Sequence, residues 1–82
     1  MNRKEVAILF KEMFDKCPSL EGKPFVLMPP NADGVLSKDY QIHINGEVDE
    51  SLLVCLRKIV MRHEKYAINV EKNLTVIYEP LK

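Results

Sequence analysis

The spacing of hydrophobic residues along this chain changes twice from a helix-like to a strand-like period, which leaves few folds open to it. Residues 49–65 show the helical period most clearly, because apolar side chains recur there every three or four residues. A similar stripe runs from Asn2 to about Lys16. Each helical stretch precedes two short segments rich in β-branched and aromatic residues. The pattern therefore predicts helix-strand-strand twice, within a single domain of residues 1–82.

Residues that start and stop helices bound both helical stretches. Asn2 can cap the first turn, and Glu5 can complete a capping box three residues later. Pro18 ends the first helix, because proline lacks an N–H and disfavours the helical conformation at Cys17. Asp49 has the residue type preferred for the cap of the second helix.

Four segments have strand character, and turn-forming residues separate them. They are residues 24–28, 40–45, 66–70 and 74–79. Prolines flank the first segment and cannot donate to a β-ladder, so we expect it at an edge of the sheet. The connection 29–38 is long for a hairpin, and such loops are often functional or mobile.

These elements predict an α+β two-layer sandwich in the order α-β-β-α-β-β, with two helices on one face of a four-stranded antiparallel sheet. A right-handed crossover through the second helix would make the second and third strands parallel. If the fourth strand inserts between them, the strand order is first-second-fourth-third. Moving the first strand of a ferredoxin-like domain to its end gives this topology, so we interpret the fold as circularly permuted ferredoxin-like. Another strand order is the alternative.

The sheet face away from the helices is expected to be open. In the fourth strand, alternation is interpreted as placing Leu74, Val76 and Tyr78 in the core. The residues expected on the open face are Gln41, His43, Asn45, Ala67, Asn69, Thr75, Ile77 and Glu79, with either Val26 and Met28 or Phe25 and Leu27 from the first strand.

The charge balance gives the chain no global attraction for nucleic acid or an anionic membrane. Lys plus Arg and Asp plus Glu each number 12, so the net charge is zero. A local basic patch of Arg57, Lys58, Arg62 and Lys65 on the second helix could still contact phosphates. Sheet-based RNA readers stack bases on exposed aromatic residues, whereas the three tyrosines alternate into the core. A solvated helix face is the competing interpretation.

The two cysteines, Cys17 and Cys55, are interpreted as reduced thiols packed on helices. The N-terminus does not resemble a signal peptide, and no apolar run approaches the roughly 18 residues of a membrane span. We therefore expect a cytoplasmic protein that makes no contact with a membrane.

No metal-binding signature is complete. Cys55 and His63 lie about two helical turns apart, too far to share a metal ion without other elements. Asn31, Asp33 and Asp39 could supply oxygen ligands from the loop, but the first and last ligands of an EF-hand are missing. We expect neither a metal nor a cofactor, and ion or ligand binding by this loop is left open.

A catalytic group is equally incomplete. His43 and Thr75 lie on strands expected to be neighbours, with Glu71 or Glu79 nearby. A nucleophile, a base and an orienting carboxylate would need such proximity, but any open sheet offers it. The sequence therefore favours a protein that is not an enzyme.

The leading hypothesis is a small non-enzymatic binding module whose partner is a protein, including a second copy of itself. It would act through the open sheet face or through the edge of the first strand. The candidate interaction residues are Gln41, His43, Asn45, Asn69, Thr75 and Ile77. The alternative is a nucleic-acid-binding accessory domain that uses Arg57, Lys58, Arg62 and Lys65.

Overall fold

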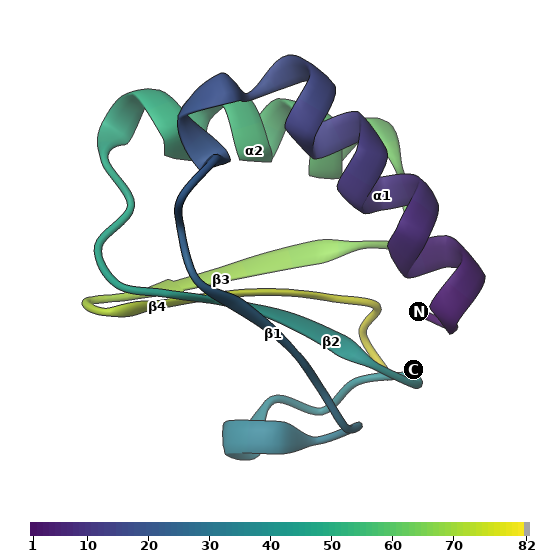
Figure 1. Ribbon diagram of the computed structural model, residues 1–82. Helices are drawn as coiled ribbons and strands as arrows, with labels where there is room; N and C mark the ends of the chain where they lie inside the picture. The colour runs from purple at the N-terminus through teal and green to yellow at the C-terminus, as the bar shows by residue number, and fades with distance from the viewer. Residues whose placement is uncertain (82) are drawn as a thin grey trace.

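The computed structural model describes residues 1–81 and shows two helices stacked on one face of a four-stranded sheet (Figure 1). The helices are α1 (Arg3–Lys16) and α2 (Glu50–Arg62). The strands are β1 (Phe25–Met28), β2 (Gln41–Asn45), β3 (Ala67–Glu71) and β4 (Leu74–Tyr78). Two short 3₁₀ turns, η1 (Pro18–Leu20) and η2 (Ala32–Gly34), lie in the connections.

The predicted element order and strand order are both confirmed. The sheet has the order β1-β2-β4-β3, and every neighbouring pair is antiparallel. Since β2 and β3 both run opposite to β4, they are parallel to each other, as a crossover through α2 requires. The relation to a permuted ferredoxin-like domain stays a prediction.

The helix caps form as the sequence predicts. The Asn2 side chain accepts from the Glu5 N–H at 2.8 Å, and the Glu5 carboxylate accepts from the Asn2 N–H at 2.9 Å. Asp49 accepts from the Leu52 N–H at 2.7 Å. Each such cap contributes about 1 kcal/mol of helix stability. Helix α2 ends at Arg62, earlier than expected, because the chain turns at His63 toward β3.

One hydrophobic core lies between the helices and the sheet. The stripes of α1 and α2 supply its upper layer, and alternate residues of the strands supply its lower layer. Its buried members are Met1, Val6, Leu9, Met13, Cys17, Leu20, Ile42, Ile44, Leu52, Leu56, Ile59, Val60 and Ile77. Within residues 1–81, no helix has both the length and the apolar character that a membrane crossing demands.

The assignment of faces in β4 is wrong by one residue. Ile77 lies opposite Ile42 and Thr75 opposite Ile44, so Thr75 and Ile77 face the helices. Val76 lies opposite His43, on the face away from the helices. The alternation misled because both sides of β4 are apolar: Val76 and Ile77 are adjacent, and both are buried.

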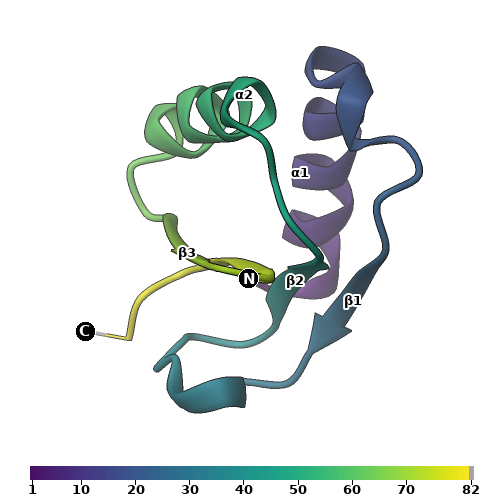
Figure 2. The ribbon, with the colours of Figure 1, turned by 90° about the vertical axis from the view of Figure 1, so that its left-hand side faces the viewer.

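The face away from the helices is also not fully open. The connection between β1 and β2, residues 29–40, folds beneath the sheet on that side (Figures 1 and 2). The C-terminal segment runs beside this loop. The Lys38 N–H donates to the Glu79 carbonyl at 2.8 Å, and Ser37 forms an isolated antiparallel β-bridge with Pro80. The sheet was predicted to be covered on one face only, by the helices. In the structure, the loop and the C-terminal segment partly cover the other face as well.

The expectation that both cysteines are reduced thiols is wrong. Cys17, directly after α1, forms a disulfide with Cys55 in the middle of α2. The packing of α1 against α2 brings the two Cα atoms to 6.0 Å, within the range of a disulfide. The bond joins two elements that are far apart in the sequence, so neither residue's local pattern predicts it.

Candidate functional site

Gln41 and His43, two predicted interaction residues, are buried beneath the 29–40 loop. Gln41 Nε2 donates to the Val35 carbonyl at 2.7 Å and to Ser37 Oγ at 2.8 Å. Its Oε1 therefore faces His43 Nε2 at 2.7 Å, and this nitrogen must carry the proton. With exposed fractions of 0% and 3%, these side chains hold the loop to the sheet and are closed to a partner.

Two of the three loop residues considered as oxygen ligands contact other residues of the loop and the sheet, and the third, Asp39, is exposed. Asn31 Oδ1 accepts from the Ser37 N–H at 3.0 Å. Asp33 Oδ2 lies 3.5 Å from His43 Nδ1. Among residues 1–81, no three His, Cys, Asp or Glu side chains cluster in a way that could hold a metal ion.

Thr75 and Ile77, also predicted to contact a partner, are inaccessible, with exposed fractions of 1% and 0%. Thr75 lies on the face opposite His43, so these two residues cannot act as a nucleophile and base. The other two members of the predicted set remain on the surface: Asn45 is exposed and Asn69 is half-buried. A continuous binding face built from the six residues does not exist.

Two of the four residues in the predicted basic patch are paired with carboxylates of α1. Arg62 lies 2.9 Å from Glu12 Oε2, and Lys65 forms an ion pair with Glu5. Arg57 and Lys58 stay exposed on α2. Because the local charge is partly neutralised, the patch offers a weak electrostatic footprint for nucleic acid.

The same pairs shift the pKa values of their groups. The hydrogen bond from His63, at 2.8 Å, lowers the pKa of Glu12, and Arg62 lowers it further. The pKa of Glu5 is lowered, first by its hydrogen bond with Lys65. Burial raises the pKa of the Tyr66 hydroxyl. These contacts fasten α1 to the segment that enters β3.

Strand β1 is an edge of the sheet with free backbone groups. The Asn45 N–H donates to the Pro24 carbonyl at 2.9 Å, so the Pro24 carbonyl points toward β2. Successive residues of an antiparallel strand alternate in direction, so the N–H and C=O groups of Phe25 and Leu27 point away from β2. Val26 and Met28 point toward β2 and pair with it. The outer side of β1 can therefore accept another strand.

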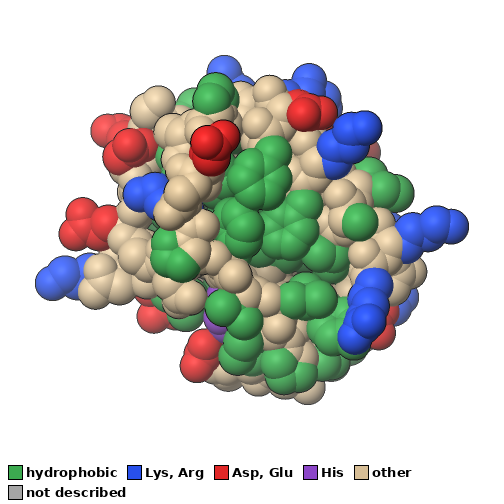
Figure 3. Space-filling model, viewed as in Figure 1, with side chains coloured by type: hydrophobic (Ala, Val, Ile, Leu, Met, Phe, Trp, Pro, Cys, Tyr) green, Lys and Arg blue, Asp and Glu red, His purple; other side chains and the backbone are tan. Residues whose placement is uncertain are grey.

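Apolar side chains surround this free edge. Phe10 and Phe14 of α1 pack against Phe25, with ring centroids 5.1 and 5.3 Å from it. Phe14, Val26 and Leu27 are 41%, 46% and 37% exposed. Figure 3 shows the resulting hydrophobic surface in the middle of the view, between α1 and β1. We call Phe10, Phe14 and the strand Phe25–Met28 the β1 surface.

The opposite edge, β3, has a comparable backbone. The Gly46 N–H donates to the Asn73 carbonyl, so the next residue, Leu74, points toward β3 and pairs with Glu71. Alternation then leaves Val70 pointing outward, as Leu27 does at β1. Val70 and Leu27 are each 37% exposed, and each has its side chain on the helix side of the sheet.

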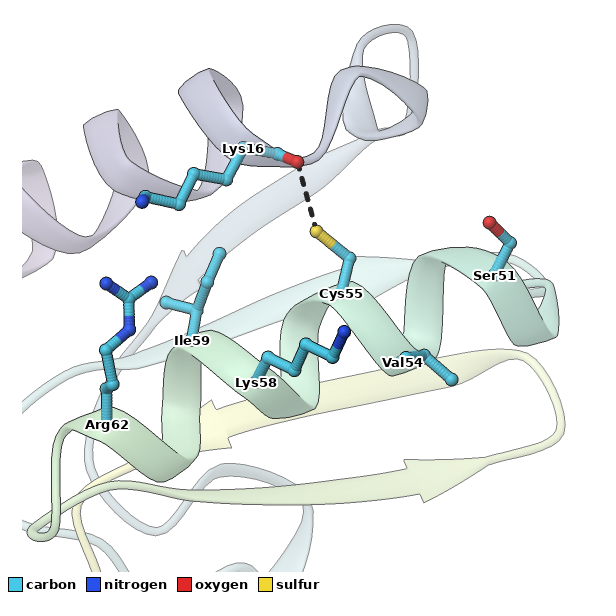
Figure 4. A pocket seen from close by; sticks show the side chains of 7 residues that line it. All are labelled: Lys16, Ser51, Val54, Cys55, Lys58, Ile59 and Arg62. Atoms are coloured by element: carbon cyan, nitrogen blue, oxygen red, sulfur yellow. Dashed lines mark hydrogen bonds between the residues drawn. The ribbon is translucent and has the colours of Figure 1, made fainter.

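A shallow pocket of about 370 Å³ lies between the end of α1 and the outer side of α2 (Figure 4). Its lining includes Cys55 and three cationic side chains, from Lys16, Lys58 and Arg62. None of its lining residues is acidic. The sequence did not predict this pocket, because its parts come from two helices whose relative placement no local pattern gives.

The comparisons with known proteins do not add a family to this geometry. No protein-family model, no curated protein and no solved structure matches the chain. Function must therefore be argued from the surfaces themselves. The most complete of them is the β1 surface, of which the sequence indicated only the edge position of the strand.

Proposed function

We propose that the protein is a non-enzymatic binding module that accepts an extended, apolar peptide segment of a protein partner along β1. The added segment would pair with the outward N–H and C=O groups of Phe25 and Leu27. The observation that carries this proposal is an unpaired edge strand with no charged residue between Phe25 and Met28. Such strands are templates for β-strand addition.

The side chains of the β1 surface suit an apolar ligand. Alternate residues of an added strand would contact Leu27 on the helix side and Val26 on the other side. The exposed ring of Phe14 extends the helix side of this surface toward α1. Backbone pairing supplies affinity in this mode of recognition, and contacts of alternate side chains supply selectivity.

The two other parts of the earlier interpretation stay predictions. Binding of nucleic acid through α2 has lost support, because Glu12 and Glu5 neutralise Arg62 and Lys65. A cytoplasmic location was argued from reduced cysteines and from the lack of a signal-peptide pattern. The Cys17–Cys55 disulfide removes the first of these two arguments, because disulfides are rare in the cytosol.

Proline substitution at matched edge positions tests the proposal. Random peptides of about seven residues, roughly the length of a strand, would be displayed and selected for binding to the whole protein. Leu27→Pro removes an outward N–H of β1, and Val70→Pro removes the equivalent group of β3. We expect Leu27→Pro to weaken binding of the selected peptides about tenfold, because proline removes one ladder hydrogen bond, worth at most about 1.5 kcal/mol.

We expect Val70→Pro to leave the affinity unchanged. Thermal unfolding of both variants controls for loss of folding. Undiminished binding by folded Leu27→Pro, or equal losses in the two variants, would contradict the proposal. A selection that yields no binding peptide would contradict it as well.

A further inference from the structure

The disulfide is buried unequally at its two ends. Cys17 is 1% exposed and belongs to the core. Cys55 is only partly buried and lines the pocket between the two helices (Figure 4). A molecule in solution can therefore reach the sulfur of Cys55, while the sulfur of Cys17 is shielded by the core.

The pocket around Cys55 is cationic. Lys16 and Lys58 line it as exposed ammonium groups, and the Arg62 guanidinium extends from α2 toward α1 (Figure 4). Arg62 forms an ion pair with Glu12, whereas no ion pair is found for Lys16 or Lys58 within residues 1–81. An electropositive, partly exposed setting is the environment in which sulfur exchange is favoured.

We propose that this pocket binds a small anionic thiol, of the class of short cysteine-containing peptides with free carboxylates, which forms a mixed disulfide with Cys55. The bound thiol loses its proton to water, and the thiolate attacks Cys55 Sγ. A new S–S bond forms as the Cys17–Cys55 bond breaks, and Cys17 leaves with the electron pair and takes up a proton. One thiol is consumed and one is released, so no other oxidant or reductant is needed.

The cations serve two purposes in this exchange. They attract the carboxylates of the incoming peptide, and they favour its thiolate over its thiol near Cys55. The neighbouring backbone acts in the opposite sense on Cys55 itself, since its Sγ lies 3.2 Å from the Lys16 carbonyl oxygen (Figure 4). A free Cys55 thiolate would be repelled by that oxygen, which carries a partial negative charge. The site therefore favours Cys55 in a disulfide, with either Cys17 or the bound thiol.

The proposal concerns a surface different from the β1 surface, so it stands or fails separately. Intact protein would be incubated with reduced glutathione as the probe, and the adduct located by mass spectrometry of peptides. We expect one glutathionyl group, attached to Cys55. Attachment at Cys17, or reduction of the disulfide with no adduct formed at any glutathione concentration, would overturn the proposal.

Charge reversal tests the role of the pocket. We expect Lys58→Glu to slow adduct formation with glutathione about three- to tenfold. The rate with 2-mercaptoethanol, which attacks as a thiolate but carries no carboxylate, should fall by a smaller factor. Lys4→Glu is the matched control, because Lys4 lies 13 residues before Cys17, about 20 Å along α1. Equal effects of the two substitutions would overturn the proposal.

Single-cysteine variants give a second, independent readout. Cys17→Ser leaves Cys55 free to react with oxidised glutathione, in which one glutathione is released as a thiol. Cys55→Ser leaves only the buried Cys17. We expect the first variant to form the adduct at least tenfold faster than the second, with folding of both verified by circular dichroism. Similar rates in the two folded variants would overturn the assignment of Cys55 as the reactive sulfur.

Discussion

The two edges of the sheet, β1 and β3, have similar backbones and different side chains. Each presents an outward residue, Leu27 or Val70, that is 37% exposed. No charge lies within β1, whereas β3 ends in Glu71 and Lys72 follows it. Charges at an edge strand oppose pairing with other chains. Charges at β3 therefore oppose strand addition at that edge, and no charge within β1 opposes it there.

The edges are also secured by different forces. A hydrogen bond of Glu12 with His63 and an ion pair of Glu5 with Lys65 fasten α1 to the chain just before β3. On the other side, the Cys17–Cys55 disulfide closes a loop that contains β1 and β2 and leaves β3 and β4 outside it. Strand β1 therefore lies within a covalently closed loop, whereas the entry to β3 is held by charged groups whose state pH can change.

Reduction of the disulfide should have the largest effect. The two cysteines are 38 residues apart, and opening a loop of that length lowers the free energy of unfolding by about 4 kcal/mol in the chain-entropy estimate. Guanidinium unfolding with and without a reductant would measure it. The Cys17→Ser/Cys55→Ser double variant should match the reduced protein and ignore the reductant. An unchanged unfolding midpoint after complete reduction would show that the bond adds no stability.

A charge placed on β1 should make this edge resemble β3. Val26→Lys puts an ammonium group on a side chain that is 46% exposed, so we expect the free energy of unfolding to change by less than about 0.5 kcal/mol. Binding of the selected peptides should weaken about tenfold, as for loss of an important interface residue. Val70→Lys is the control at β3 and should not alter affinity. Titration calorimetry would compare them, and equal losses would remove the distinction between the edges.

Acid should loosen the β3 side, with the smallest effect of the three. The pKa values of Glu5 and Glu12 are lowered from 4.5, so their contribution to stability is complete above that pH and is lost as the pH falls through the lowered values. Loss of the partly exposed Glu12 pairs should lower the free energy of unfolding by about 0.5 kcal/mol. Amide exchange of β3 should accelerate below pH 4.5 relative to β1, after correction for intrinsic rates. Glu12→Gln should reduce this difference, and an unchanged difference would contradict the role of Glu12.

The arrangement of helices and strands could be predicted because the local signals agree with the tertiary fold. Asn2 and Asp49 cap their helices in the structure as their residue types indicate. The prolines around β1 correctly indicated an edge strand. Once the two helices are assigned to one face, few strand orders satisfy a right-handed crossover, and the observed order is one of them.

The faces of the sheet could not be predicted from alternation alone. In β4 both faces are buried, so the pattern from Leu74 to Tyr78 fits either assignment. The burial of Gln41 depends on hydrogen bonds to Val35 and Ser37, which exist only when the loop folds beneath the sheet. Polar residues that alternate with apolar ones usually indicate a strand face exposed to solvent. In β2 they lie instead on a face that a loop covers.

The candidate site was harder still to predict, because it depends on how elements distant in the sequence pack together. Phe14 belongs to the apolar stripe between Asn2 and Lys16 that predicts a buried helix face, yet it is 41% exposed because it packs at the margin, beside Phe25. The pairing of Cys17 with Cys55 requires the crossing of α1 and α2, which no residue spacing within either helix encodes. The sequence located the edge strand, and the structure supplied the surface around it.

Hydrogen exchange of single β1 amides would show whether a bound peptide pairs with the outer side of this strand. The N–H groups of Phe25 and Leu27 point outward, while those of Val26 and Met28 pair with β2. NMR exchange rates would be measured for these amides with and without a selected peptide. We predict that the peptide slows exchange at Phe25 and Leu27 at least tenfold, and leaves the already slow Val26 and Met28 little changed. Protection at Val70 in β3, or a bound peptide that leaves Phe25 and Leu27 unprotected, would contradict strand addition at β1.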